Sequence, residues 1–276
     1  VLRRVGWDAE ADGLFGAPPI HVVLGEEAHS TVFSGLRYLG LGAKRVVSVD
    51  LNRHMRPKLL LACAQRLGQC VTQIAKAVDG DVEEIRARHA RMLEKLTTSG
   101  NLAAATEGVV EYHAPMDATR TGFAENQFDC IFSNSVLEHV PPDVIDAMYV
   151  EALRILDANG VMFHSVNCGD HYAYVDRSIH QLHYLRYSDA QWTRWNNAFL
   201  YQNRMRAHVF VERAEDLGFQ ILLNTAKPSE LRMQQLASTP VHAQFAGIPP
   251  ERLCITSVDF IARKIGRSDP AIAGVA

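Results

Sequence analysis

The chain has 276 residues, of which 47% are hydrophobic and 21% are charged, and its formal net charge is −3. Such a chain can bury a large core without disulfides. The small negative charge argues against a nucleic-acid partner, because nucleic-acid-binding domains usually present a basic surface. No apolar run is long enough to span a membrane and no signal peptide opens the sequence, so we expect a cytoplasmic protein with no membrane partner.

Metal-binding and redox motifs are absent from the cysteine pattern. The five cysteines are odd in number and form no C-x-x-C pair, which favours reduced, buried thiols. His180 and His183 are spaced for one face of a helix, but no acidic partner stands at a recognisable distance from them. No metal site is predicted.

Apolar runs and helical spacing alternate along the chain after an irregular lead-in at residues 1–19. Strands are predicted at residues 20–24, 45–49, 109–113, 129–133, 161–166, 219–224 and 257–264. Helices are predicted at residues 30–41, at 57–96 with breaks at 68 and 79–81, at 143–156 and at 209–217. The charges of residues 81–96 are typical of a solvated helix face. Residues 225–256 are predicted to be a loop rich in proline.

This alternation predicts an α/β fold with a mostly parallel sheet and helices on both of its faces. Residues 167–208 interrupt the pattern, because they are rich in Tyr, His, Trp and Asn and poor in aliphatic side chains. We therefore expect one domain over residues 20–265, with an insertion after the fifth strand and a tail at 266–276.

The most specific motif is FDCIFSNSVLEHV at residues 128–140, a short strand that ends in a polar break. Ligands of open parallel sheets bind at the carboxyl ends of the strands. The motif resembles the fourth-strand motif of class I S-adenosylmethionine-dependent methyltransferases, and residues 152–163 resemble the helix-turn-strand element that follows it in that family. The resemblance covers residues 46–264. It implies a Rossmann-like sheet of seven strands with S-adenosylmethionine as the cofactor.

The resemblance also assigns cofactor-binding residues at the strand ends. Asp50 follows the second strand, where an acidic residue typically accepts hydrogen bonds from ribose hydroxyls, and Leu51 continues the same rim. Asp50 can also be read as a cap for the next turn. Asp117 and Ala118 match the position that reads the adenine edge, although Asp117 can equally make its own loop turn.

The methionyl end of the cofactor is expected near the first and fourth strands. Ser133 and Asn134 end the fourth strand, and their backbone is placed there by the resemblance. Gly25 matches the first glycine of the family's cofactor loop, and Glu26 follows it. Glu27 and His29 stand where the family has further glycines, so the loop takes another route or binds the cofactor weakly or not at all.

A second, shorter resemblance covers residues 13–42, which are similar to a segment of bacterial pyridoxal-phosphate-dependent decarboxylases. The rest of that fold and its Schiff-base lysine motif have no counterpart in the chain. We therefore interpret this segment as a convergent or fused first strand-helix unit, without pyridoxal chemistry.

The insertion is the predicted acceptor region. Asp170 and His171 begin it, and the pair fits a general base in which the imidazole accepts a proton near neutral pH. The alternative is a packed lid whose polar groups are satisfied by neighbours. Together these features predict methyl transfer to an oxygen or nitrogen of a small-molecule acceptor by a protein that can form a homo-oligomer. The competing hypothesis is a non-catalytic relative with a role in binding or assembly.

Overall fold

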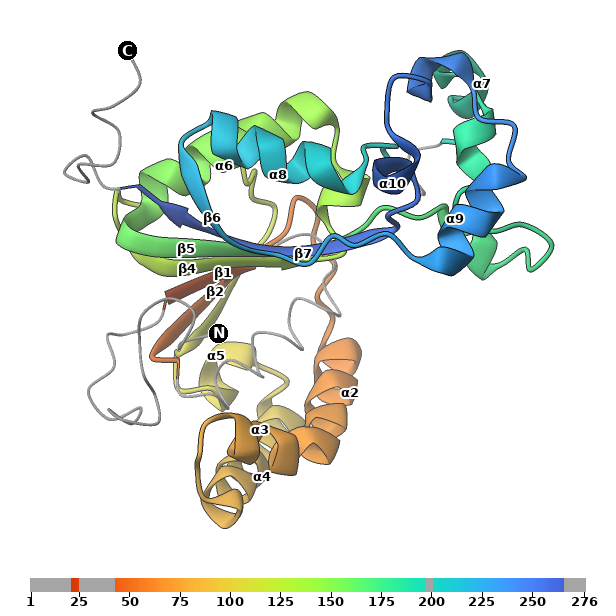
Figure 1. Ribbon diagram of the computed structural model, residues 1–276. Helices are drawn as coiled ribbons and strands as arrows, with labels where there is room; N and C mark the ends of the chain where they lie inside the picture. The colour runs from red at the N-terminus through yellow and green to blue at the C-terminus, as the bar shows by residue number, and fades with distance from the viewer. Residues whose placement is uncertain (1–20, 25–42, 197–200, 266–276) are drawn as a thin grey trace. The chain divides into compact units, whose positions relative to one another are not determined.

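The computed structural model describes residues 21–24, 43–196 and 201–265, and of residues 21–24 it describes the backbone (Figure 1). These residues contain a seven-stranded sheet with the order β3-β2-β1-β4-β5-β7-β6. The strands are β1 (His21–Leu24), β2 (Arg45–Val49), β3 (Val110–His113), β4 (Phe128–Asn134), β5 (Leu156–Asn167), β6 (Phe219–Asn224) and β7 (Ser257–Lys264). β1 pairs in parallel with both β2 and β4, and β2 pairs in parallel with β3. The seven predicted strands are confirmed.

The fifth strand is longer than predicted. It begins at Leu156, directly after the preceding helix, and not at Val161. The Asn159-Gly160 pair predicts a turn, and the chain does turn within residues 156–160. A Cβ at Gly160 would lie 2.9 Å from the side chain of Leu156, whereas residues four apart in an extended strand are about 13 Å apart. The N–H of Asn159 donates to Oδ1 of Asp157 over 2.8 Å in the same turn.

Contacts between Cα atoms divide the chain into two compact units. The described part of the first unit holds the residues up to Ser133, then Glu151–Met162 and the end of the chain from Lys264. The second unit holds Asn134–Val150 and Phe163–Arg263.

Helices of the first unit follow the predicted breaks. They are α2 (Pro57–Leu67), η2 (Gly68–Cys70), α3 (Val71–Ala77), α4 (Val82–Ser99) and α5 (Leu102–Ala105). The carboxylate of Asp81 accepts a hydrogen bond from the backbone N–H of Glu84 and caps the start of α4. Gly100 ends this helix in a left-handed conformation at φ 62°, which glycine adopts at little cost.

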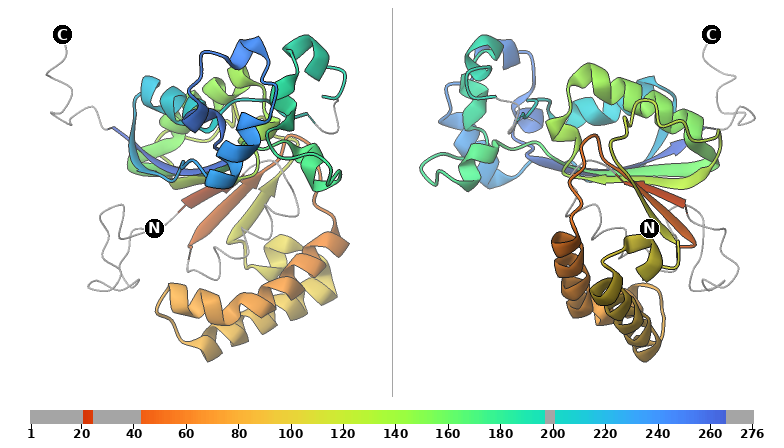
Figure 2. Two further views of the ribbon diagram at one scale, coloured as in Figure 1. Left: turned by 45° about the vertical axis from the view of Figure 1, so that its right-hand side comes forward. Right: turned by 180° about the vertical axis from the view of Figure 1, so that it is seen from behind.

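An apolar core joins these helices to β2 and β3. Val46 and Val110 contribute from the two strands, and Leu60, Ile74 and Leu96 contribute from the helices. Each such side chain adds about 1.5–3 kcal/mol when it is fully buried. The opposite face of α4 carries exposed ion pairs between Arg86 and Glu83 and between Arg88 and Glu84, as expected of a solvated helix face. Figure 2 shows α2, α3 and α4 side by side.

The described residues of the second unit contain most of α6 and eight further helical segments. The helix α6 (Pro142–Ile155) lies across the boundary between the units. The others are η3 (Leu137–His139), η4 (His171–Tyr174), η5 (His183–Arg186), α7 (Asp189–Trp192), α8 (Ala207–Asp216), α9 (Glu230–Ala237), η6 (Ala243–Phe245) and α10 (Pro250–Leu253). The hydroxyl of Tyr149 in α6 donates to the carbonyl of Phe210 in α8 over 3.3 Å.

The prediction of a plain loop at residues 225–256 was wrong, because α9, η6 and α10 lie in it. Each of these segments is short, and each buries a single side chain, so no helical period is visible in the sequence. Leu236, Phe245 and Leu253 join a core with Tyr184 and Trp192. Packing, and not intrinsic propensity, accounts for these helices.

Two predictions about the whole chain are also tested. The five cysteines all lie among the described residues, and none of them forms a disulfide. Among the described helices, none combines the length and the apolar character that a membrane crossing requires.

Candidate functional site

The order of the strands places a ligand-binding position in the first unit. Counting outward from β1, the sheet continues through β2 on one side and through β4 on the other, so the order reverses between β1 and β4. In open α/β sheets such a reversal opens a crevice beyond the carboxyl ends of the two strands, where ligands bind. Ser133 lies at this end of β4, and Asp50 follows β2, which pairs with the other edge of β1.

Asp50 is a buried carboxylate, and only one of its two oxygens accepts a hydrogen bond from the described residues. Its side chain is 1% exposed. The hydroxyl of Tyr112 donates to its Oδ2 over 2.7 Å. Its Oδ1 is also buried, and no group of the described residues forms a hydrogen bond with it. Burial raises the pKa of Asp50, and the hydrogen bond from Tyr112 and the charge of His54 offset part of this effect.

Tyr112 organises the backbone around this carboxylate. Besides donating to Asp50, its hydroxyl accepts hydrogen bonds from the backbone N–H groups of His54 and Met55, over 3.2 and 3.3 Å. The loop after β2 is therefore tied to β3. Sequence reasoning missed Tyr112. Its signal is weak, because a tyrosine in a strand is usual, and only the pairing of Ser48 with Tyr112 in the β2–β3 register brings it near Asp50.

Asp117 lies on a loop that is hydrogen-bonded to the end of β2. The carbonyl of Asp50 accepts a hydrogen bond from the N–H of Met116 over 2.8 Å. Asp117 itself is exposed, and its Oδ1 accepts from the N–H and the hydroxyl of Thr119 over 2.8 and 2.7 Å. These hydrogen bonds lower the pKa of Asp117. The side chain therefore makes the local turn that the sequence left open as an alternative.

The remaining predicted cofactor residues differ in exposure. Leu51 is 51% exposed and Ala118 is half-buried. Ser133 is buried, whereas Asn134 is exposed. Gly25 and Glu26, and the loop that contains them, lie outside the described residues.

Polar groups of the second unit gather around His171. Its imidazole packs edge to face against that of His139, with ring centroids 4.9 Å apart. Its Nε2 is buried and has no hydrogen-bond partner among the described residues. Burial and the neighbouring His139 lower the pKa of His171 to about 4, so the ring is neutral at physiological pH.

Asp170 is oriented differently from the prediction. Its side chain is 1% exposed, and its Oδ1 accepts from the N–H of Tyr172 over 2.9 Å, which caps η4. Its Oδ2 lies 3.7 Å from Nδ1 of His183. Burial raises the pKa of Asp170 to about 6, and hydrogen bonds from backbone N–H groups oppose this. The carboxylate therefore faces His183 and the start of η4, not the imidazole of His171, because capping directs it back along its own turn.

Residues 201–206 form an extended segment that holds this region. Asn203 donates from Nδ2 to the carbonyls of Leu137 and Val140 over 2.7 and 2.8 Å. The side-chain oxygen of Gln202 accepts from the N–H of His171 over 3.2 Å. Gln202 and Asn203 are 2% and 7% exposed, so these hydrogen bonds are shielded from water and fix the two turns.

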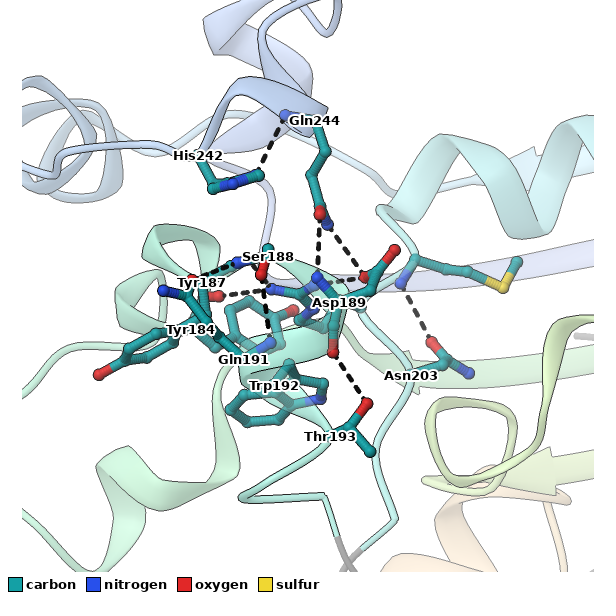
Figure 3. A network of polar contacts seen from close by, with 12 residues as sticks. Tyr184, Tyr187, Ser188, Asp189, Gln191, Trp192, Thr193, Asn203, His242 and Gln244 are labelled. Carbon is teal, nitrogen blue, oxygen red and sulfur yellow. Dashed lines mark hydrogen bonds and ion pairs between the residues drawn. The ribbon is translucent and has the colours of Figure 1, made fainter.

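Two arginines anchor the same segment. Arg204 forms an ion pair with Asp189, whose carboxylate also accepts from Gln244, and Figure 3 shows the network around Asp189. Arg206 is 1% exposed and donates to the carbonyls of Cys168, Leu253 and Ile255. Both arginines therefore serve the packing of the second unit.

Comparisons with known proteins were made for the whole chain. Residues 88–164 match the model of a family described as methyltransferase domain. The matched range contains the motif at residues 128–140. No curated protein matches the chain at a significant level.

Three solved structures illustrate the similarity of backbone. A putative methyltransferase from Bacillus halodurans C-125 is 14% identical over 89% of this chain and 93% of its own, with a TM-score of 0.45. A SAM-dependent methyltransferase from Methanosarcina mazei is 13% identical over 90% and 93%, with a TM-score of 0.46. Geranyl diphosphate C-methyltransferase from Streptomyces coelicolor A3(2) is 14% identical over 90% and 70%, with a TM-score of 0.45. At these values the similarities carry no argument about substrate.

The family match and the strand order agree with each other. The matched residues include β3, β4 and most of β5, and the sheet reverses its order at the position where nucleotide-binding sheets hold their ligands. Residues 88–164 thus match a methyltransferase domain, and they lie in an α/β sheet whose strand order is that of nucleotide-binding sheets.

Proposed function

We propose that this protein is an S-adenosylmethionine-dependent methyltransferase that acts on an oxygen or nitrogen nucleophile of a small molecule. The bound cofactor supplies an electrophilic methyl group on a positively charged sulfur. The protein therefore has to hold a nucleoside and to align the acceptor, and positioning supplies much of the rate. The observation that carries the proposal is the buried Asp50 carboxylate at the end of β2, whose Oδ1 has no hydrogen-bond partner among the described residues.

The residues of the first unit fit the nucleoside part of the cofactor. A buried acceptor without a partner loses about 1–3 kcal/mol, which a ribose hydroxyl would restore by donating to Oδ1 of Asp50. Tyr112 fixes the orientation of this carboxylate by holding Oδ2. We assign the exposed side chain of Leu51 to the adenosine, and Asp117 with the N–H of Ala118 to the adenine edge.

The methionyl part of the cofactor is assigned to the ends of β1 and β4. Gly25 and Glu26 follow β1, and Ser133 and Asn134 end β4. The adjacency of these strands in the sheet supports the assignment, because the strand order reverses between them.

For the acceptor we propose a role for His171. Its buried Nε2 has no partner among the described residues, so its lone pair is available to a group that enters the site, and a proton of the acceptor is one such group. Asp170 is a positioning residue in this proposal. It caps η4 and thereby fixes the backbone of His171.

Calorimetric titration with S-adenosylhomocysteine tests the cofactor assignment. We expect saturable binding at micromolar ligand for the wild-type protein and weaker binding for Asp50→Ala. Asp216→Ala is the matched control, because Asp216 is an exposed aspartate at the end of α8. The absence of heat at millimolar ligand for the wild-type protein would contradict the proposal.

A further inference from the structure

Three side chains of the second unit bring metal-binding atoms together. Glu138 and His139 belong to η3, and His171 begins η4. Each residue offers one ligand atom, and the three atoms all lie within 4.8 Å of one another. Ligands at about 2.1 Å from a cation lie about 3–3.5 Å apart. The three atoms are therefore at most about 1–2 Å farther apart than this spacing.

The environment of His139 selects the tautomer that a metal requires. Its Nδ1 lies 2.7 Å from the backbone carbonyl oxygen of Tyr201. A carbonyl oxygen can only accept a hydrogen bond, so Nδ1 carries the proton and Nε2 keeps its lone pair. Metal-binding histidines are commonly oriented in this way, by a hydrogen bond from the second ring nitrogen to a carbonyl or a carboxylate.

The other two residues are also suited to a cation. The Nε2 atom of His171 is buried without a hydrogen-bond partner among the described residues, which is unfavourable unless a ligand occupies it. Glu138 is 1% exposed, and its Oε1 accepts from the N–H of Asn167 over 3.3 Å. A buried carboxylate is stabilised by a nearby positive charge, which a cation would supply.

A rigid frame holds the three ligands. The N–H of Asn203 donates to the carbonyl of Glu138 over 2.8 Å. Gln202 accepts from the N–H of His171, and its Nε2 donates to the carbonyl of Gly169 over 2.6 Å. One segment thus fixes the backbone of both turns that carry the ligands. Such support around the ligands is typical of sites that are formed before the metal binds.

We propose that Glu138, His139 and His171 bind a divalent transition-metal ion. Two imidazoles and one carboxylate are a common donor set for Zn²⁺ and Fe²⁺, and three protein ligands leave coordination positions open. The lone pair of His171 then serves the cation and not a proton of the acceptor. Sequence spacing did not reveal this site, because His171 lies in a different segment of the chain from the other two ligands.

The role of this ion rests on the proposed methyl transfer. In that reaction the cation replaces the lone pair of His171 as the group that activates the acceptor, and it narrows the acceptor to a hydroxyl compound. A hydroxyl oxygen that binds the cation loses its proton to solvent more readily. The oxygen then forms a bond to the methyl carbon while the carbon–sulfur bond breaks, and the electron pair of that bond stays on sulfur. The products are a methyl ether and a neutral thioether.

Cobalt titration tests the site without any need for the acceptor. Metal-free protein, prepared with a chelator, is titrated with Co²⁺ and followed by its visible absorption. We expect ligand-field bands that saturate at one equivalent and that Zn²⁺ abolishes. His139→Gln and Glu138→Gln should weaken Co²⁺ binding by about 100-fold or more, because loss of a ligand exceeds the effect of losing its support.

His171→Gln is the variant that should fold in every case, because Nε2 of His171 makes no hydrogen bond among the described residues that could be lost. His242→Ala is the matched control: this histidine of the same unit caps η6 and is not one of the three ligands. Absence of the bands in the wild-type protein, or unchanged bands in His171→Gln, would overturn the site.

Titration with S-adenosylhomocysteine separates this inference from the proposed function. Nucleoside binding without Co²⁺ binding overturns the metal site and leaves the proposed function intact. Co²⁺ binding without nucleoside binding overturns the catalytic role of the ion. Binding of both supports the inference.

Discussion

Asp50→Asn isolates the contribution of the buried carboxylate to cofactor binding. The substitution keeps the shape of the side chain and one oxygen acceptor, and it removes the charge. We expect S-adenosylhomocysteine to bind more weakly to this variant, because a hydroxyl donates a stronger hydrogen bond to a carboxylate than to an amide.

The size of this loss in affinity follows from the hydrogen bond that Oδ1 of Asp50 can accept from the ligand. A hydrogen bond to a charged group contributes about 1.5–3 kcal/mol and one to a neutral group about 0.5–1.5 kcal/mol. The loss on Asp50→Asn is therefore about 1–1.5 kcal/mol, which raises Kd about 5- to 12-fold. Asp50→Ala loses the whole bond and should raise Kd about 10- to 150-fold.

Stability changes in the opposite direction from affinity. Burial raises the pKa of Asp50, so the folded state binds its proton more tightly than the unfolded state does. The ionised form is therefore disfavoured by folding, and this unfavourable effect is present at neutral pH and disappears as the pH falls. Asp50→Asn removes it, so its Tm should equal or exceed that of the wild-type protein.

The assay is calorimetric titration with S-adenosylhomocysteine at neutral pH, with a thermal melt of each variant. Tyr112→Phe is the companion variant, because it leaves Oδ2 of Asp50 without its donor. We expect it to weaken binding and to lower the free energy of unfolding by about 1–3 kcal/mol. An unchanged affinity for Asp50→Asn and Asp50→Ala, with both proteins folded, would refute the assignment of Asp50 to the ribose.

Three further predictions concern stability, and all are measured by urea denaturation. Burial acts to raise the pKa of Glu151, but hydrogen bonds from Arg154 and Thr121 outweigh it and lower the pKa to about 2. Glu151→Gln should therefore reduce the free energy of unfolding at pH 7 by at most about 3 kcal/mol. That contribution should vanish between pH 4.5 and about 2, and equal stability of the two proteins at pH 7 would contradict it. Burial lowers the pKa of His164 to about 3, so the free energy of unfolding of the wild-type protein should decrease as the pH falls from 6.5. His164→Phe should make this decrease smaller. The prediction is contradicted if the two proteins show the same dependence of stability on pH. Arg206→Met should reduce the free energy of unfolding by at least about 3 kcal/mol, because three buried carbonyls lose their hydrogen-bond donor. A reduction below about 1 kcal/mol would disprove the structural role of Arg206.

The strands and the long helices could be predicted because each carries its own signal. Val46, Val47 and Val49 form a buried run that reads as a strand in isolation. Asp81 and Gly100 mark the ends of a helix through local backbone preferences. Such signals depend on neighbours in the sequence, so a single sequence contains them.

The short helices and the side-chain partners could not be predicted in this way. α9 and α10 depend on a core built from distant segments. The same reason explains why Asp170 was paired with its neighbour His171 although its carboxylate faces His183. Gln202 and Asn203 looked like ordinary polar residues, and their role depends on carbonyls that are far away along the chain.

The position of Asp50 could be predicted from the sequence, whereas the hydrogen-bond partners of its carboxylate could not. A strand that ends in an acidic residue is visible in the sequence. That Tyr112 donates to one oxygen of this carboxylate follows only from the register of β2 and β3.

The most direct test of the central claim is a crystal structure of the protein with bound S-adenosylhomocysteine. We predict that a ribose hydroxyl lies about 2.7 Å from a carboxylate oxygen of Asp50, beyond the carboxyl end of β2. A nucleoside bound elsewhere, with Oδ1 of Asp50 in contact with the protein's own groups, would contradict the account.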